Sequence, residues 1–76
     1  MTNTNWEPIH QGGILCYRKY QPKQRGSAWM YDATAIVTPD KYGATLNIFC
    51  QGEIEFSEHC PSISLAKRMA TKLFNS

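Results

Sequence analysis

The sequence predicts an α+β fold, in which an antiparallel meander of three to four strands carries one C-terminal amphipathic helix on one face. Apolar and polar residues alternate through most of residues 14–58, a pattern typical of half-buried strands. Glycine and proline residues separate these segments. Apolar residues then recur at helical spacing over residues 64–74. The 76 residues make a single domain, 1–76, and residues 1–12 are expected to form a loose N-terminal arm.

Three segments form the main part of the predicted sheet. Residues 14–20 alternate imperfectly, which is typical of an edge strand, and Arg18 and Lys19 would discourage pairing with another edge. Residues 29–38 and residues 44–51 alternate more regularly. We therefore expect the second and third of these strands to supply most of the buried face.

A shorter fourth strand is expected over residues 53–58, with Ile54 and Phe56 buried. It follows the pair Gln51–Gly52, which suits a tight hairpin because glycine accepts a left-handed backbone. These features complete the meander before the helix begins.

The predicted helix has one apolar stripe, and Ser62 or Ser64 can cap its first turn. A helix this short is marginal by itself, so the stripe must pack on the sheet. The stripe comprises Leu65, Ala66, Met69, Ala70, Leu73 and Phe74. Its expected partners are Ala35, Val37, Leu46 and Ile48. The opposite face, with Thr34, Ile36, Asn47 and Phe49, is polar with scattered apolar groups.

Charge is distributed unevenly along a chain whose net charge is only +2. No carboxylate occurs between Glu7 and Asp32, and this interval holds a basic, aromatic segment over residues 16–31. A local acidic strip lies further along the chain, made of Glu53, Glu55 and Glu58. The protein is therefore expected to be dipolar rather than polycationic.

The cysteines and the hydropathy of the chain indicate its compartment. Three widely spaced cysteines argue against a secreted disulfide scaffold. No signal peptide is apparent, and no apolar run reaches the length needed to span a bilayer. We expect a cytoplasmic protein with free thiols and no membrane association, in the cytoplasm of the host cell if the protein is viral.

Neither a metal site nor a catalytic site is predicted. The residues that can bind soft metals lack the short spacing of a structural zinc site; they are His10, Cys16, Cys50, His59 and Cys60. His59 and Cys60 are neighbours on a strand, so they point to opposite faces and cannot act as base and nucleophile. No glycine-rich phosphate loop or nucleophile elbow is present. We expect no enzyme activity, no cofactor and no metal.

The candidate partner-binding residues fall into two groups. Arginine and aromatic side chains often anchor protein interfaces, which selects Arg18, Tyr20, Lys23, Arg25 and Trp29. The acidic strip is the second group, and it can imitate phosphates toward a partner that binds nucleic acid. The alternative is a nucleic-acid-binding module, in which the basic residues of segment 17–31 contact phosphates and its aromatic rings stack on bases.

Two resemblances bear on this choice. The strand–turn–strand–turn–strand–helix half that ends in SLAKRMATKLF resembles the βββα part of double-stranded-RNA-binding domains. That family begins its last helix with lysines, whereas Ser62, Ile63 and Ser64 stand here, and no first helix precedes the sheet. The resemblance therefore implies only the βββα order of elements, and it assigns no RNA-contact residue to this chain.

The chain also resembles small accessory proteins of bacteriophages and prophages, including anti-CRISPR proteins, in its size, its α+β architecture and its lack of catalytic motifs. This resemblance implies a cytoplasmic inhibitor that occupies the working surface of a host protein. We therefore predict a non-enzymatic binding protein of viral or mobile-element type, which inhibits or modulates a host protein or a nucleic-acid-binding complex by masking its surface.

Overall fold

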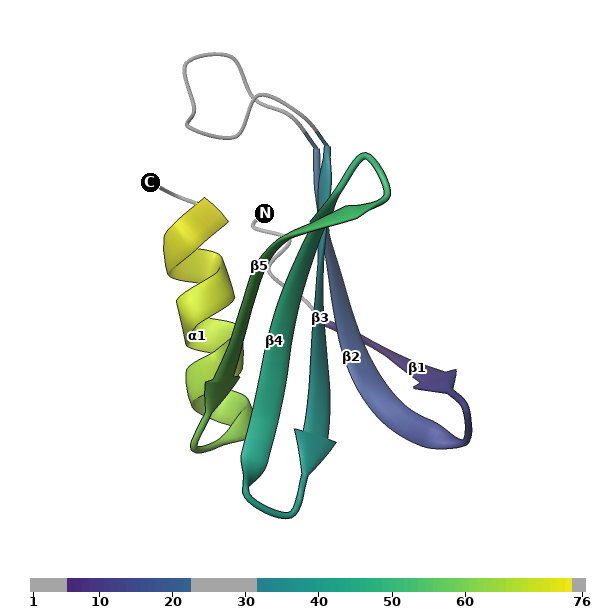
Figure 1. Ribbon diagram of the computed structural model, residues 1–76, viewed down its shortest axis with the longest axis vertical. Helices are drawn as coiled ribbons and strands as arrows, with labels where there is room; N and C mark the ends of the chain where they lie inside the picture. Colours follow the sequence, from purple (N-terminus) through teal and green to yellow (C-terminus); the bar gives the residue numbers. More distant parts are fainter. Residues whose placement is uncertain (1–5, 23–31, 75–76) are drawn as a thin grey trace.

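The computed structural model describes residues 6–22 and 32–74 of the chain. These residues form one five-stranded antiparallel sheet in the order β1-β2-β3-β4-β5, followed by one helix (Figure 1). The elements are β1 (Glu7–Gln11), β2 (Ile14–Gln21), β3 (Ala33–Asp40), β4 (Gly43–Cys50), β5 (Glu53–Cys60) and α1 (Ile63–Phe74). The predicted α+β class and the meander with a C-terminal helix are confirmed, while the number of strands is corrected from three or four to five.

The additional strand, β1, lies within the stretch 1–12 for which we expected a loose arm. Gly12 and Gly13 have φ angles of 58° and 82°, the left-handed pair that a two-residue hairpin turn requires. This turn folds β1 back onto β2, with Ile9 opposite Cys16. Because β2 pairs with β1 on one side and β3 on the other, the prediction of an edge strand at residues 14–20 is wrong.

The core lies between α1 and one face of the sheet. β3 and β4 alternate as predicted, and Ala35, Val37, Leu46 and Ile48 are fully buried. In the register of these strands Ala35 lies opposite Ile48 and Val37 opposite Leu46. Adjacent side chains on one face of a sheet therefore form the floor on which the helix packs.

The helix buries a row of residues four positions apart, Ala66, Ala70 and Phe74. Two alanines in this row allow the helix backbone to approach the sheet closely, and Phe74 fills the space near the C-terminal end. The Ser62 hydroxyl accepts a hydrogen bond from the Leu65 N–H at 3.1 Å, which confirms the first of the two predicted caps.

The opposite face of the sheet has no helix over it within the described part of the chain, and Ile36 and Phe49 are half-buried there. A β-bulge interrupts the β4–β5 register between Ile48 and Phe49. Ile48 pairs with Phe56, whereas Phe49 pairs with Ile54, so the bulge puts Phe56 and Ile54 on opposite faces. The prediction that both are buried is therefore wrong for Ile54, which is 55% exposed.

Candidate functional site

Of the basic and aromatic residues that we predicted to bind a partner, the structure describes Arg18 and Tyr20. Lys23, Arg25 and Trp29 lie outside the described residues. Arg18 and Tyr20 lie on β2, opposite Ile36 and Thr34 of β3, and both therefore belong to the sheet face that α1 does not cover.

Arg18 has an acidic neighbour that the sequence did not indicate. Its guanidinium lies 3.0 Å from a carboxylate oxygen of Glu7, the residue opposite it on β1. Both side chains are substantially exposed, so solvent screens the pair and its contribution to stability is small. The carboxylate nevertheless reduces the positive charge that Arg18 can offer to a phosphate.

Tyr20, the other predicted contact residue on β2, is 57% exposed. A hydrogen bond with the Asp32 carboxylate raises the pKa of its phenol, with desolvation and the negative charge of Asp32 acting in the same direction. The phenol therefore stays neutral at physiological pH.

The three predicted glutamates are exposed on β5, which is an edge of the sheet. Glu58 lies opposite Leu46, and Leu46 belongs to the buried face, so Glu58 stands on the face that carries the helix. Glu53 and Glu55 come before Phe56 along β5, and they therefore lie nearer to the β4–β5 turn than Glu58 does. The strip thus follows a strand edge and approaches the helix only at Glu58.

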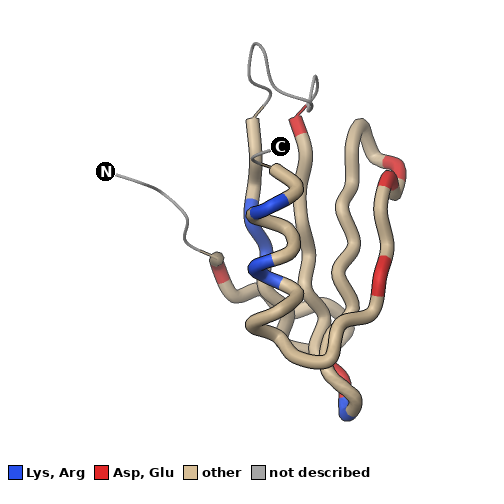
Figure 2. The backbone as a smooth tube through the Cα atoms, turned by 90° about the vertical axis from the view of Figure 1, so that its left-hand side faces the viewer, with Lys and Arg blue, Asp and Glu red and all other residues tan. Residues whose placement is uncertain are grey.

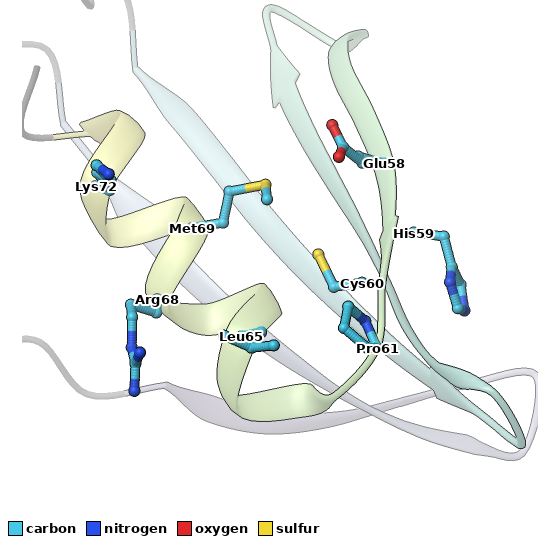
Figure 3. A pocket seen from close by; sticks show the side chains of 8 residues that line it. All are labelled: Glu58, His59, Cys60, Pro61, Leu65, Arg68, Met69 and Lys72. Carbon is cyan, nitrogen blue, oxygen red and sulfur yellow. The ribbon is translucent and has the colours of Figure 1, made fainter.

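Between β5 and α1 the surface forms a groove of about 270 Å³ (Figure 3). Met69 extends from the helix toward Cys60, and Leu65 lies one turn before it. Leu65 is 41% exposed and contributes to the wall of the groove rather than to the core. The complete lining consists of Glu58, His59, Cys60, Pro61, Leu65, Arg68, Met69 and Lys72.

Charges of opposite sign border this groove. Glu58 comes from the strand side, whereas Arg68 and Lys72 come from exposed positions four residues apart on the helix. His59 points away from the groove, as its alternation with Cys60 requires (Figure 3). The site therefore combines an apolar interior with an acidic and a basic border, which is the composition of a binding surface.

A second cluster joins the other side of the helix to β2. The Lys67 ammonium nitrogen lies 4.0 Å from the centroid of the Tyr17 ring and 6.0 Å from that of Trp6. The Lys19 nitrogen lies 6.0 Å from the Trp6 centroid and 3.4 Å from the Thr71 hydroxyl oxygen. Two cations thus lie around one indole ring, each at the outer limit of the distance over which a cation and an aromatic ring attract one another.

Sequence reasoning missed the burial of Lys19, which is only 8% exposed. Desolvation lowers the pKa of its ammonium group. Lys19 lies opposite Ala35, and this register places it on the face that α1 covers. The alternation of β2 could indicate that Lys19 shares a side with Tyr17, but only the position of the helix shows that this side is enclosed.

The thiols of the described residues are buried. Cys16, Cys50 and Cys60 are free, and burial raises the pKa of Cys50 and Cys60, helped by the charges of Glu55 and Glu58 respectively. A raised pKa keeps a thiol in its less reactive neutral form. Across residues 6–22 and 32–74, no three His, Cys, Asp or Glu side chains are grouped so that they could hold a metal ion.

No helix in the same two ranges is both long enough and apolar enough to cross a bilayer. Comparisons with protein-family models, with curated proteins and with solved structures find no match to this chain.

Proposed function

We propose that the protein is a non-enzymatic binding protein that masks the surface of a partner protein, and that it does so with the side formed by β5 and α1. The observation that carries this proposal is the groove between these elements, which has an apolar interior and an exposed Leu65 at its wall. Exposed apolar surface bordered by charge is a common feature of protein interfaces.

The distribution of charge supports the same side of the molecule. Lysine and arginine positions gather along α1 and the neighbouring part of β2, whereas the acidic strip follows β5 (Figure 2). Such separation orients an approaching partner and raises its rate of association. A partner with a basic surface, including a protein that itself binds nucleic acid, would meet the acidic strip made of Glu53, Glu55 and Glu58.

The proposal extends to an inhibitor of viral or mobile-element type, which acts in the host cytoplasm by occupying a working surface of its target. This part rests on the small α+β architecture and on the resemblance to phage accessory proteins described above. Inhibition by masking requires no catalytic group, only a surface that competes with the partner's usual ligand.

A pull-down from nuclease-treated host lysate tests the proposal. The wild-type chain should capture a defined protein, and Glu55→Gln with Glu58→Gln should reduce that capture. Glu7→Gln serves as the control for the Glu58→Gln single variant, because each neutralises one exposed strand carboxylate, but Glu7 lies on β1, at the other edge of the sheet. Capture that nuclease abolishes, or that Glu7→Gln weakens as much as the β5 substitutions, would count against the proposal.

A nucleic-acid-binding function is the second candidate, and the cluster around Trp6 favours it. Lys67 has no carboxylate partner within the part of the chain described, and Tyr17 and Trp6 offer aromatic rings beside it. A gel shift at low salt tests this function: Lys67→Glu should abolish binding to RNA or DNA, whereas Lys41→Glu, in the β3–β4 turn, should not. Absence of any shift at low salt would eliminate this candidate.

A further inference from the structure

We propose that the partner is bound by strand addition: an extended segment, basic at one end and apolar at the other, pairs with the free edge of β5 as a sixth strand and places an apolar side chain in the groove beside α1. This inference rests on the proposed function and specifies the chemistry of the partner.

The free edge of β5 is the better of the two edges for such pairing. β1 has five residues and contains Pro8, which has no N–H to donate to a further strand. β5 has eight residues without proline and pairs only with β4 in the structure described. An unpaired strand edge of this length presents a row of free backbone donors and acceptors.

The bulge limits where a partner can pair. The register shift lies where Ile48 and Phe49 meet Phe56 and Ile54, and a bulge disrupts pairing and bends the strand. The regular stretch runs from Phe56 to Cys60, and its later residues, Glu58 to Cys60, line the groove. A strand added there would place alternate side chains on the helix face, where the groove is.

Charge argues against a second copy of this chain as the occupant. Pairing β5 with another β5 would bring the acidic strip of one copy against the same strip of the other, and like charges across neighbouring strands are destabilising. Lysine or arginine side chains near Glu55 and Glu58 would instead form favourable cross-strand pairs. The strip therefore selects a segment that is basic at the bulge end.

The residues of α1 that border the groove favour an apolar rather than a basic side chain of the partner inside it. Arg68 and Lys72 border the groove on that side, so a basic side chain inside it would meet like charge. Leu65 and Met69 offer apolar contacts instead. The segment must therefore change from basic to apolar as it passes from Glu55 and Glu58 toward Pro61.

A designed peptide with capped ends, Lys-Thr-Lys-Thr-Leu-Thr-Leu-Thr, provides the probe. Its lysines and leucines share one face when it is extended. In nuclear magnetic resonance titrations it should shift the amide signals of Phe56–Cys60 and slow the hydrogen exchange of those that point outward. Replacing its lysines by glutamates should abolish binding, and Glu55→Gln with Glu58→Gln in the protein should weaken it about threefold or more, whereas Glu7→Gln should leave it unchanged.

Backbone methylation tests the strand pairing directly. Two variants of the peptide carry methyl groups on backbone nitrogens. One is methylated at odd-numbered residues and the other at even-numbered residues. In an added strand only alternate residues turn their N–H groups toward the neighbour, so one methylated peptide should bind and the other should not. If both bind as well as the parent peptide, contact is through side chains alone and strand addition is refuted.

Two further outcomes separate this inference from the proposed function. Failure of the parent peptide to bind, while the pull-down still captures a protein partner, would overturn strand addition and leave the masking function standing. Failure of the pull-down would refute the masking function, whatever the peptide does. A dimer that sedimentation detects without peptide, and that Glu58→Gln strengthens, would show that a second copy occupies the edge and would also overturn the inference.

Discussion

The ammonium group of Lys67 lies directly at the Tyr17 ring, with 4.0 Å between its nitrogen and the ring centroid. This contact joins α1 to β2, which lies beyond the strands that form the main floor of the core. It fixes the side of the helix opposite the groove, so that the two surfaces of α1 have separate roles: one row of residues binds β2, and another borders the groove.

The contact predicts a measurable coupling between Lys67 and Tyr17. In a double-mutant cycle with Lys67→Met and Tyr17→Leu, the coupling free energy should be about 0.5–1 kcal/mol, the range for a partly exposed cation and aromatic ring. Urea denaturation measures it. The matched cycle with Arg68→Met should show no coupling to Tyr17, because Arg68 borders the groove on the other side of the helix. Equal coupling in both cycles would contradict the assignment.

A second prediction concerns the small residues of the helix. Ala70 is fully buried against the sheet, so Ala70→Leu adds volume where the packing leaves no space and should lower the free energy of unfolding by about 1–3 kcal/mol. Ser64→Ala, at an exposed position of the same helix, should change it by less than about 0.5 kcal/mol. Thermal and urea denaturation of both variants distinguish these effects, and an unaffected Ala70→Leu variant would mean that the helix does not lie close to the sheet.

A third prediction uses two glycines with positive φ. Gly43 has a φ of 140°, and a Cβ atom there would collide with the carbonyl oxygen of Cys60 and the backbone of Pro61. Gly52 has a φ of 82° but open space around it. Gly52→Ala should therefore cost about 1 kcal/mol through backbone strain alone, and Gly43→Ala roughly 3 kcal/mol or more through strain and collision. Equal melting temperatures for the two variants would refute the close approach of the β3–β4 turn to the end of β5.

The sequence was sufficient for the central part of the fold, for a physical reason. In β3, β4 and α1 the periodicity of apolar residues directly reflects burial, since Val37, Leu46 and Ala66 all face one core. β1 was missed because its residues are mostly polar and its position depends on the hairpin turn at Gly12–Gly13. Ile54 was misplaced because a bulge shifts the alternation by one residue, and single-sequence patterns do not show where a bulge occurs.

The candidate site was predictable only in part. The acidic strip was visible in the sequence because its members lie close together in one strand. The groove was not, since it arises where Leu65 and Met69 of the helix approach Cys60. The burial of Lys19 was equally hidden, because it depends on the contact of β2 with Thr71 of the helix. Both features require the relative placement of elements that periodicity does not give.

A fourth prediction follows from Lys19. Desolvation lowers the pKa of its ammonium group in the folded state below the ordinary value of 10.5. Between the two pKa values the unfolded chain binds more protons, so the contribution of Lys19 makes stability rise with pH in that window. At neutral pH the buried charge is destabilising, and Lys19→Met, which keeps the apolar stem, should raise the urea midpoint. The difference between wild type and Lys19→Met should shrink as pH approaches 10.5, and a difference that stays constant would contradict this account.

Asp40 contributes to the dependence of the free energy of unfolding on pH in the acid range. The backbone N–H of Tyr42 donates a hydrogen bond to its carboxylate at 2.8 Å, and His59 lies 3.2 Å away. These interactions, the first being the larger, lower the pKa of Asp40 below its ordinary value of 3.8. The stabilisation is therefore fully present above that ordinary value and is lost as pH falls through the lowered pKa.

Comparison of two variants separates the two partners of Asp40. Asp40→Asn keeps an oxygen acceptor for the Tyr42 N–H but removes the charge, whereas Asp40→Ala removes both. At pH 6, Asp40→Ala should therefore be less stable than Asp40→Asn, and Asp40→Asn less stable than wild type. As pH falls through the lowered pKa of Asp40, the wild-type carboxylate becomes protonated and the advantage of wild type over Asp40→Asn should diminish. Chemical denaturation as a function of pH measures this, and parallel profiles for wild type and Asp40→Asn would show that the carboxylate charge does not stabilise the turn against β5.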